Sequence, residues 1–201
     1  MTAESAHAPG SPLLLYGYWR SSSAYRVRIA LNLKGLEYEQ SPVNLVRGGG
    51  EQKSADYRTI NPLGLVPALV HGDQTIVQSV AICEYLEEIF PATPLLPPDA
   101  PGRARVRSIV QSIASEIQPL NNLGVTRYLG DVMEQDGEAV RRWYGHWIAR
   151  GFAAVEAWLS AAETGRFCHG DYPTMADCFL VPQVYNAERF GCDLEPYPRL
   201  M

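Results

Sequence analysis

The segment Arg20–Arg28, with the sequence RSSSAYRVR, is the part of the chain best equipped for chemistry. Three hydroxyl side chains, Ser21, Ser22 and Ser23, stand where a short apolar run gives way to a helical pattern. The first turn of a helix offers unpaired backbone N–H groups and the positive end of the helix dipole, which favour an anion. A hydroxyl donor beside them can also stabilise a thiolate. The pattern predicts either an anion or thiolate site or a plain serine cap of a helix.

A second helix start carries the polar residues Gln78 and Ser79. Ser79 can cap the helix that follows and can also bond a ligand carboxylate, with Gln78 alongside. Between the two helix starts, Pro67 follows Val66 at the beginning of a predicted strand. A proline there marks either an edge position or a cis peptide bond that exposes neighbouring backbone groups.

A polar stripe runs along a predicted helix in the second half of the chain. At about 100° per residue, Gln111, Ser115, Gln118 and Asn122 share one face, opposite an apolar face at 106–120. The stripe contains no Lys or Glu, which is unusual for a fully solvated face. Its two interpretations are a wet surface and the lining of a cavity, and the composition favours the cavity.

The elements that must position these residues follow from hydrophobic periodicity and turn signals. Short strands and helices alternate in the first half, which implies a small mixed sheet covered by helices. A hairpin is indicated by His71-Gly72-Asp73 between two apolar runs. The expected order is a strand at 13–16, a helix at 22–34, a strand at 37–45, a short helix at 52–58, strands at 66–70 and 74–77, and a helix at 79–89.

The segment 90–101 contains five prolines in twelve residues and predicts an extended linker. The second half is helical in pattern throughout, and a capping box formed by Thr174 and Asp177 starts its last predicted helix. We therefore expect an α+β protein with a first domain at 12–90, a Pro-rich linker at 91–102 and an all-helical domain at 103–201.

Composition excludes several classes of function. The 201 residues are 46% hydrophobic and 19% charged, with a net charge of −5, as in a folded globular protein without a footprint for nucleic acid or anionic membranes. No apolar stretch is long enough to span a bilayer, and residues 1–12 lack the pattern of a leader peptide, so a cytoplasmic location is expected. The four cysteines, at positions 83, 168, 178 and 192, have no C-x-x-C spacing and predict packed, reduced thiols rather than a metal site.

Several motifs together resemble those of the zeta-class glutathione transferases, and more narrowly those of the maleylacetoacetate isomerase family. The similarity covers nearly the whole chain after about residue 13. The motifs are SSSAYRVRIAL at 21–31, Asn61-Pro62, Val66-Pro67, Gln78-Ser79, IQPLNNL at 117–123, TMAD at 174–177 and LVPQVYNAERF at 180–190.

The resemblance implies a glutathione transferase fold: a thioredoxin-like N-terminal domain that holds glutathione, an all-helical C-terminal domain, and a homodimer. It implies that Ser21 donates to the glutathione sulfur, with Ser22 and Ser23 in the same catalytic turn. The residues that it implies for glutathione binding are Ser21, Ser22, Arg26, Gln52 at the glycyl end, Val66 before a cis Pro67 at the cysteinyl unit, Gln78 and Ser79 at the γ-glutamyl end, and Gln118 and Asn122 from the second domain.

The chain departs from the family pattern at two positions. The family's serine-rich turn often carries a cysteine third, where this chain has Ser23, so a thiol nucleophile would have to come from glutathione. Many relatives carry Arg where this chain has Gly124, and relatives continue through a further helix beyond the equivalent of Met201.

The activity that the resemblance implies is glutathione-dependent cis–trans isomerisation of 4-maleylacetoacetate to 4-fumarylacetoacetate, a step of tyrosine and phenylalanine breakdown. Arg20 and Arg189 are the candidate cations for the two substrate carboxylates. The alternatives are maleylpyruvate isomerisation, a conjugating or dehalogenating zeta-class transferase, and a glutathione-binding protein without catalysis.

Overall fold

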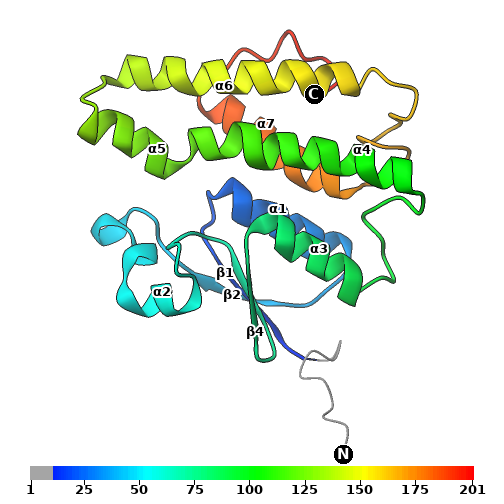
Figure 1. The fold of residues 1–201 in the computed structure, drawn as a ribbon, viewed down its shortest axis with the longest axis horizontal. Helices are drawn as coiled ribbons and strands as arrows, with labels where there is room; N and C mark the ends of the chain where they lie inside the picture. The colour runs from blue at the N-terminus through cyan, green and yellow to red at the C-terminus, as the bar shows by residue number, and fades with distance from the viewer. Residues whose placement is uncertain (1–10) are drawn as a thin grey trace, which may run out of the picture. The chain divides into compact units, whose positions relative to one another are not determined.

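A computed structural model describes residues 11–201 and divides the chain into two compact units, one ending at Leu95 and the other running from Leu96 to Met201 (Figure 1). The boundary falls inside the proline-rich segment. Most of the N-terminal segment predicted to hold no leader peptide, residues 1–10, lies outside the described range. Among the described residues, no helix is both long enough and apolar enough to cross a membrane.

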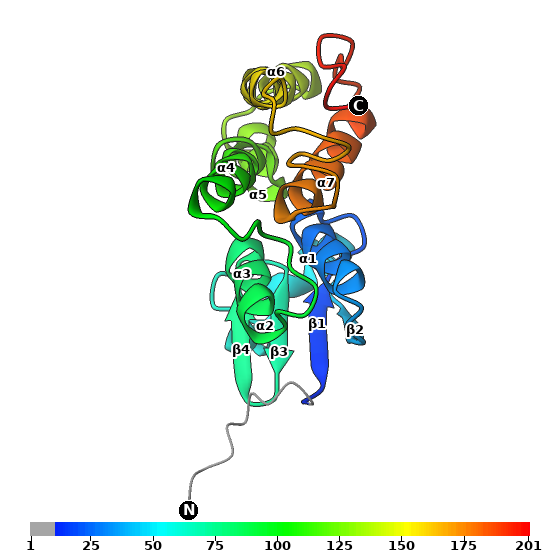
Figure 2. The same cartoon turned by 90° about the vertical axis from the view of Figure 1, so that its right-hand side faces the viewer.

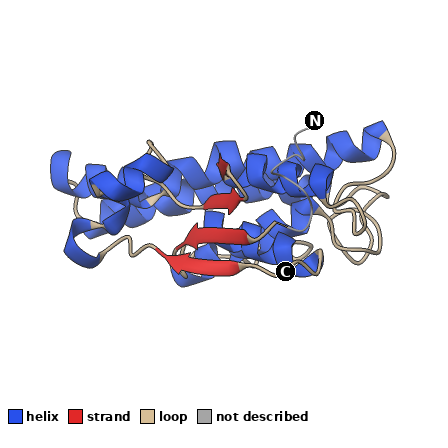
Figure 3. Ribbon diagram, turned by 90° about the horizontal axis from the view of Figure 1, so that it is seen from below, coloured by secondary structure: helices blue, strands red, loops and turns tan. Residues whose placement is uncertain are grey.

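The first unit follows the predicted order of strands and helices. Its four strands form one mixed sheet in the order β2-β1-β3-β4, in which only the β1–β2 pair is parallel (Figure 3). The elements are β1 (Leu13–Gly17), α1 (Ser22–Leu33), β2 (Glu39–Pro42), η1 (Arg47–Gly49), η2 (Glu51–Lys53), α2 (Ala55–Ile60), β3 (Ala68–His71), β4 (Gln74–Val77) and α3 (Ser79–Ile89). This is the thioredoxin-like arrangement that the sequence predicts.

Helices α1 and α3 lie side by side in the first unit (Figures 1 and 2). Each buries an apolar face, as Leu31 of α1 and Ile82 and Leu86 of α3 are completely inaccessible. Leu15 and Leu69 supply the matching core residues from the two central strands. Burial of such side chains contributes roughly 1.5–3 kcal/mol each, and the packing fixes where the two helices begin relative to the sheet.

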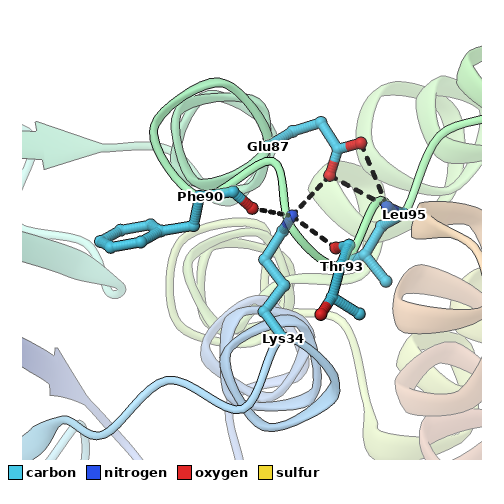
Figure 4. Close-up of polar contacts among 5 residues, drawn as sticks. All are labelled: Lys34, Glu87, Phe90, Thr93 and Leu95. Carbon is cyan, nitrogen blue, oxygen red and sulfur yellow. Dashed lines mark hydrogen bonds and ion pairs between the residues drawn. The ribbon is translucent and has the colours of Figure 1, made fainter. Parts of the chain in front are cut away.

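A buried ion pair joins the far ends of the same two helices (Figure 4). Lys34 Nζ lies 2.7 Å from Glu87 Oε2 and donates to the carbonyls of Phe90 and Thr93 at 3.0 and 2.9 Å. The Glu87 carboxylate also accepts the Leu95 N–H at 3.1 and 3.0 Å. The pair therefore anchors the chain as it leaves α3 and enters the proline-rich segment.

The named elements of the second unit are all helical. They are α4 (Ala100–Gln111), the π-helical η3 (Ser112–Ile117), η4 (Gln118–Asn121), α5 (Leu123–Arg127), the π-helical η5 (Tyr128–Val132), α6 (Gly137–Trp158) and α7 (Met175–Arg189). Helix α4 begins inside the predicted linker because Asp99 caps it through the Gly102 N–H and Pro101 is tolerated in a first helical turn.

The predicted polar stripe does not continue along one regular helix. The apolar residues Val106, Ile109, Val110, Ile113 and Ile117 are buried as expected. Ser115 still bonds Gln111 one turn earlier, but the π-helical segment and the 3-10 helix after it change the periodicity before Gln118 and Asn122. The continuous face predicted at 100° per residue is therefore wrong beyond Ser115.

The capping box at the start of α7 is confirmed. The Asp177 carboxylate accepts the backbone N–H of Thr174 at 2.7 Å and its hydroxyl at 2.8 Å. The other carboxylate oxygen accepts the Cys168 N–H at 2.9 Å. Asp177 thus has a folding role, holding the loop before α7 to the first turn of that helix.

Candidate functional site

The register of β1, β3 and β4 brings three predicted site segments together at one end of these strands. Tyr16 of β1 pairs with Ala68 of β3, and Ala68 pairs on its other side with Val77 of β4. The residues next to these pairs belong to the turn into α1, the Val66–Pro67 bond and the start of α3. The turn into α1 therefore meets two segments that lie more than forty residues further along the chain.

Ser21 caps helix α1, as the sequence predicts. Its Oγ accepts the Ala24 N–H at 3.2 Å, and its backbone is extended at φ −72° and ψ 115°. The hydroxyl hydrogen is not used in that bond and can donate to an anion in front of the helix. Ser22 is buried and Ser23 is partly exposed. Ser21 can therefore cap the helix and also donate a hydrogen bond to a thiolate, as predicted.

The start of α3 differs from the prediction that Ser79 caps it. Ser79 is the first helical residue and is buried, whereas Gln78 occupies the cap position without a side-chain bond to the helix. Gln78 is exposed and has a φ of 71°, a left-handed value uncommon for a non-glycine residue. That backbone geometry turns the chain sharply from β4 into α3 and leaves the Gln78 amide at the surface.

Arg26 connects α1 to the first residue of α3 through a buried hydrogen bond. It is 1% exposed, and its Nη1 donates to Ser79 Oγ at 3.1 Å. Burial lowers the pKa of Arg26 to about 10, and the neighbouring Cys83 opposes that shift only partly. The guanidinium therefore keeps its charge at neutral pH while lying in the interior.

Gln52 lies in η2 and is buried, and its Oε1 has no hydrogen-bond partner within the described chain. Its carboxamide packs against the backbone of Gly50, where a Cβ would stand 2.5 Å from Oε1. Gly50 also has a φ of 114°. The positive φ favours glycine here, and a side chain at this position would displace the Gln52 amide from where it lies. A buried amide oxygen without a partner is a candidate contact for a ligand donor.

The Val66–Pro67 peptide bond is cis, as the resemblance implies. The segment before it is held by α2 and the residue that follows α2, because the Leu65 carbonyl accepts the Tyr57 hydroxyl at 2.8 Å and the Asn61 amide at 2.7 Å. Burial raises the pKa of Tyr57 to about 12, so its hydroxyl stays a donor.

The loop between β1 and α1 is held by Arg28. Its guanidinium donates to the carbonyls of Tyr18 and Trp19 at 3.4 and 3.1 Å. Arg20 is exposed and lies over the Trp19 ring, with 5.1 Å from the guanidinium carbon to the ring centroid. The loop thus presents one cation to solvent immediately before Ser21.

Three predicted site residues belong to the second unit. Asn122 caps α5, accepting the Val125 N–H at 3.0 Å and donating to the Pro119 carbonyl at 2.8 Å, so both ends of its amide are already engaged. Gln118 opens η4 and is partly exposed. Arg189 ends α7, is exposed, and lies 4.7 Å from the centroid of the Phe190 ring.

The cysteines of the chain are unsuited to act as nucleophiles. Cys83, Cys168 and Cys178 are buried, and Cys192 is partly buried. Burial raises the pKa of Cys83 to about 12, and it also raises the pKa values of Cys168 and Cys192. In the part of the chain that the structure describes, no group of three or more His, Cys, Asp or Glu side chains could hold a metal ion.

The sequence did not predict the residues that hold the loops of the site in place by hydrogen bonds. Tyr57 was not singled out, and Arg28 was recognised only as part of the Arg20–Arg28 segment, although each bonds a carbonyl in a loop that carries site residues. Asn61 was recognised only as part of a motif. Arg28, the second arginine of Arg26-Val27-Arg28, could have indicated a structural role in this loop. Its partners could not be predicted, because the partner of a long side chain depends on the tertiary fold.

Comparisons with known proteins agree with this arrangement. Residues 11–88 match the family described as "Glutathione S-transferase, N-terminal domain". The chain is 51% identical to "Probable maleylacetoacetate isomerase 2" of Drosophila melanogaster over 188 residues, covering 94% of this chain and 80% of that protein.

Two solved structures are similar over most of their length. The "holo structure of Maleyl Pyruvate Isomerase, a bacterial glutathione-s-transferase in Zeta class" has a TM-score of 0.90 and 46% identity, covering 93% of this chain and 88% of that one. The maleylacetoacetate isomerase of Anaeromyxobacter dehalogenans, "with bound dicarboxyethyl glutathione and citrate in the active site", has a TM-score of 0.82 and 46% identity, covering 96% and 85%. The chain belongs to the zeta-class glutathione transferases, the family that includes the maleylacetoacetate isomerases.

Proposed function

We propose that this protein is a glutathione-dependent cis–trans isomerase that converts 4-maleylacetoacetate to 4-fumarylacetoacetate. One observation carries the proposal: the Ser21 helix cap, the cis Pro67 and the start of α3 lie together at one end of strands β1, β3 and β4. The family relationship supports it, since similar proteins bear the names of isomerases that act on maleyl acids.

The residues present suit glutathione. A tripeptide with two carboxylates and a thiol needs anion sites at its ends and a donor at its middle. The buried Gln52 amide oxygen, which has no partner within the described chain, can accept the N–H of the glycyl residue. The start of α3, with Gln78 and Ser79, can receive the γ-glutamyl carboxylate. Val66, ahead of the cis bond, can pair its backbone with the cysteinyl unit.

When bound, glutathione would supply a thiolate nucleophile for reversible addition to the conjugated cis alkene, the chemistry that cis–trans isomerisation requires. In the chain itself, Ser21 donates its hydroxyl hydrogen to the sulfur, and the positive end of α1 favours the ionised thiol. Ser22 and Ser23 belong to the same turn. Arg20 offers a cation for a substrate carboxylate, and we assign the second carboxylate to Arg189.

The interior cysteines bear on the question of which sulfur attacks the substrate. Burial raises the pKa of Cys83 to about 12 and also raises the pKa of Cys168, so both thiols stay protonated at neutral pH. These two thiols are therefore unsuited to attack a substrate, which supports glutathione as the source of the nucleophilic sulfur. Because Ser23 stands where relatives often have cysteine, the proposed reaction depends on the bound thiol alone.

Maleylpyruvate is the second candidate substrate. Its isomerase is the namesake of the similar structure with a TM-score of 0.90, and both acids present a cis alkene conjugated to a ketone. An adduct carrying two carboxylates on glutathione occupies the active site of the Anaeromyxobacter relative, which supports a dicarboxylate as the substrate class here.

The deciding experiment follows isomerisation of both maleyl acids with and without glutathione while free thiol is measured. Glutathione-dependent turnover at constant thiol supports the proposal, and the ratio of kcat/KM values identifies the preferred acid. Loss of thiol with halide release from α-halo acids would instead indicate a conjugating or dehalogenating transferase. Glutathione binding without any turnover would indicate a binding protein.

The proposal extends to assembly and location. We propose a homodimer in the cytoplasm that serves tyrosine breakdown, with a glutathione-binding domain at 12–90, a linker that begins at 91 and ends at Asp99, where α4 is capped, and a substrate domain in place of the predicted 103–201 that starts with α4. The family relationship supports these statements. Sedimentation equilibrium across a concentration series tests the dimer, and a single species of 22.3 kDa would exclude it.

A further inference from the structure

We propose that Arg26 is a positioning residue of the glutathione site, which acts through Ser79 rather than by contacting the ligand. The inference rests on the proposed function and deepens it. It differs from the expectation drawn from the family resemblance, in which Arg26 is itself a glutathione contact. The distinction matters because an indirect role makes a specific prediction about how two substitutions combine.

The geometry separates Arg26 from the surface. Its side chain comes from the second turn of α1 and is 1% exposed. Nη1 donates to Ser79 Oγ at 3.1 Å, and this buried bond joins residues 53 positions apart. Ser79 is the first residue of α3 and is 6% exposed. A side chain this deeply buried, directed at a ligand-binding hydroxyl from behind, reaches the site by way of that hydroxyl.

The hydrogen bond determines what Ser79 can do. A serine hydroxyl has one hydrogen to donate and two lone pairs that accept. Because Arg26 occupies a lone pair of Ser79 Oγ, the hydroxyl is polarised and its hydrogen is directed away from the guanidinium. Arg26 therefore prepares Ser79 as a donor, which is the role that a carboxylate in front of the α3 N-terminus requires.

The charge of Arg26 acts in the same direction. Burial lowers its pKa only to about 10, so it remains a cation at neutral pH. The adjacent Cys83 thiol is fully buried with its pKa raised to about 12, and it therefore stays neutral and does not cancel that charge. Because the donor is charged, the bond to Ser79 Oγ is stronger than one between neutral groups, and it holds the orientation of that hydroxyl more firmly.

A double-mutant cycle read by calorimetric glutathione binding tests the proposal. We expect Arg26→Gln and Ser79→Ala each to weaken binding roughly tenfold, as loss of a charge-assisted hydrogen bond would. The double variant should bind no more weakly than Ser79→Ala alone. Cysteinylglycine, which lacks the γ-glutamyl unit, should bind the Arg26→Gln variant and the unaltered protein equally.

Further variants keep the test decisive. Arg26→Lys, which retains a buried cation and a donor, should recover part of the lost affinity, and circular dichroism reports whether each variant folds. Arg105→Gln is the matched control: that guanidinium bonds the Trp158 carbonyl and the Thr164 hydroxyl within the second unit and should not affect glutathione binding.

The outcomes separate this inference from the function on which it rests. Additive losses in the double variant would mean that Arg26 contacts glutathione independently, and equal losses for cysteinylglycine would mean that Arg26 only maintains the fold. Either result overturns the positioning role while leaving the isomerase proposal standing. Absence of glutathione binding by the unaltered protein would overturn both.

Discussion

The Lys34 ammonium lies 2.7 Å from the Glu87 carboxylate, and the two side chains are 1% and 7% exposed (Figure 4). Lys34 follows the last residue of α1 and Glu87 lies in the last turn of α3. Removing one member of a buried pair leaves the other charge without compensation. This relationship distinguishes the pair from the surface ion pairs of the same protein.

We expect Lys34→Met to lower the free energy of unfolding by about 3–5 kcal/mol, because Glu87 would lose its cation and the Phe90 and Thr93 carbonyls would lose a donor. Arg142→Met is the control, since Arg142 lies at the same 2.7 Å from Glu138 but both side chains are more than 60% exposed. That change should cost under about 1 kcal/mol. Urea unfolding measures both, and equal losses would contradict the anchoring role.

Ser21→Ala should reduce isomerase turnover roughly 10²-fold while changing glutathione affinity much less. Ser21 donates to the sulfur in the proposed mechanism, so its loss also moves the alkaline rise of the pH–rate profile to higher pH. The cap of α1 is lost too, at about 1 kcal/mol. Asp136→Ala, which removes the cap of α6 at Ala139, controls for that stability effect and should leave turnover unchanged. An Ser21→Ala variant as active as the original would refute the assignment.

Ser23→Cys should retain isomerase activity and acquire sensitivity to iodoacetamide. The position lies in the first turn of α1 and is partly exposed, where a thiol is accessible and favoured in its ionised form. The unaltered protein and Ser23→Ala should resist the reagent under native conditions, because the natural cysteines are wholly or partly buried. Rapid inactivation of the unaltered protein would show that one of those thiols is reachable and required.

Arg20→Gln should raise KM for the dicarboxylate substrate roughly tenfold with little change in glutathione affinity. The guanidinium is exposed next to the Ser21 turn, where it contacts Tyr18 and Trp19, and no carboxylate of the described residues pairs with it. Arg28→Gln should act differently, lowering kcat as well, since Arg28 holds the loop through the Tyr18 and Trp19 carbonyls. Steady-state kinetics with either substrate varied separates the two effects.

Stability should fall as the pH rises above about 9. The Cys83 thiol has an ordinary pKa of 9.0, and burial raises its pKa in the folded protein to about 12. The folded state therefore holds this proton more tightly, and its contribution is complete below pH 9 and is lost progressively between pH 9 and 12. Cys83→Ala should show a shallower decline between about pH 8 and about pH 10.5 in urea unfolding. Parallel declines would indicate that other groups account for the effect.

Local chemistry was sufficient to predict much of the first unit. The serine before α1 and the hairpin between β3 and β4 are encoded by a few neighbouring residues, so their positions could be read directly. The polar stripe failed because π-helical hydrogen bonding at 112–117 depends on packing that periodicity does not contain. The start of α4 at Ala100 was hidden by prolines that suit a first turn.

The candidate site divides in the same way. Hydroxyls at helix starts could be recognised from sequence, whereas the bond between Arg26 and Ser79 required a fold that joins distant segments. The burial of Lys34 could not be predicted either, because lysine is ordinarily a surface residue and only its interior partners make this one an exception.

The left-handed backbone at Gln78 links local strain to the proposed contact with the cofactor. Glycine would adopt a φ of 71° without strain, so Gln78→Gly would relieve a local cost on the order of 1 kcal/mol. The same change would delete the amide proposed to hold the γ-glutamyl end. A substitution that relaxes the backbone at this position would therefore also remove the proposed contact with the cofactor, so local strain and ligand binding are coupled in one residue.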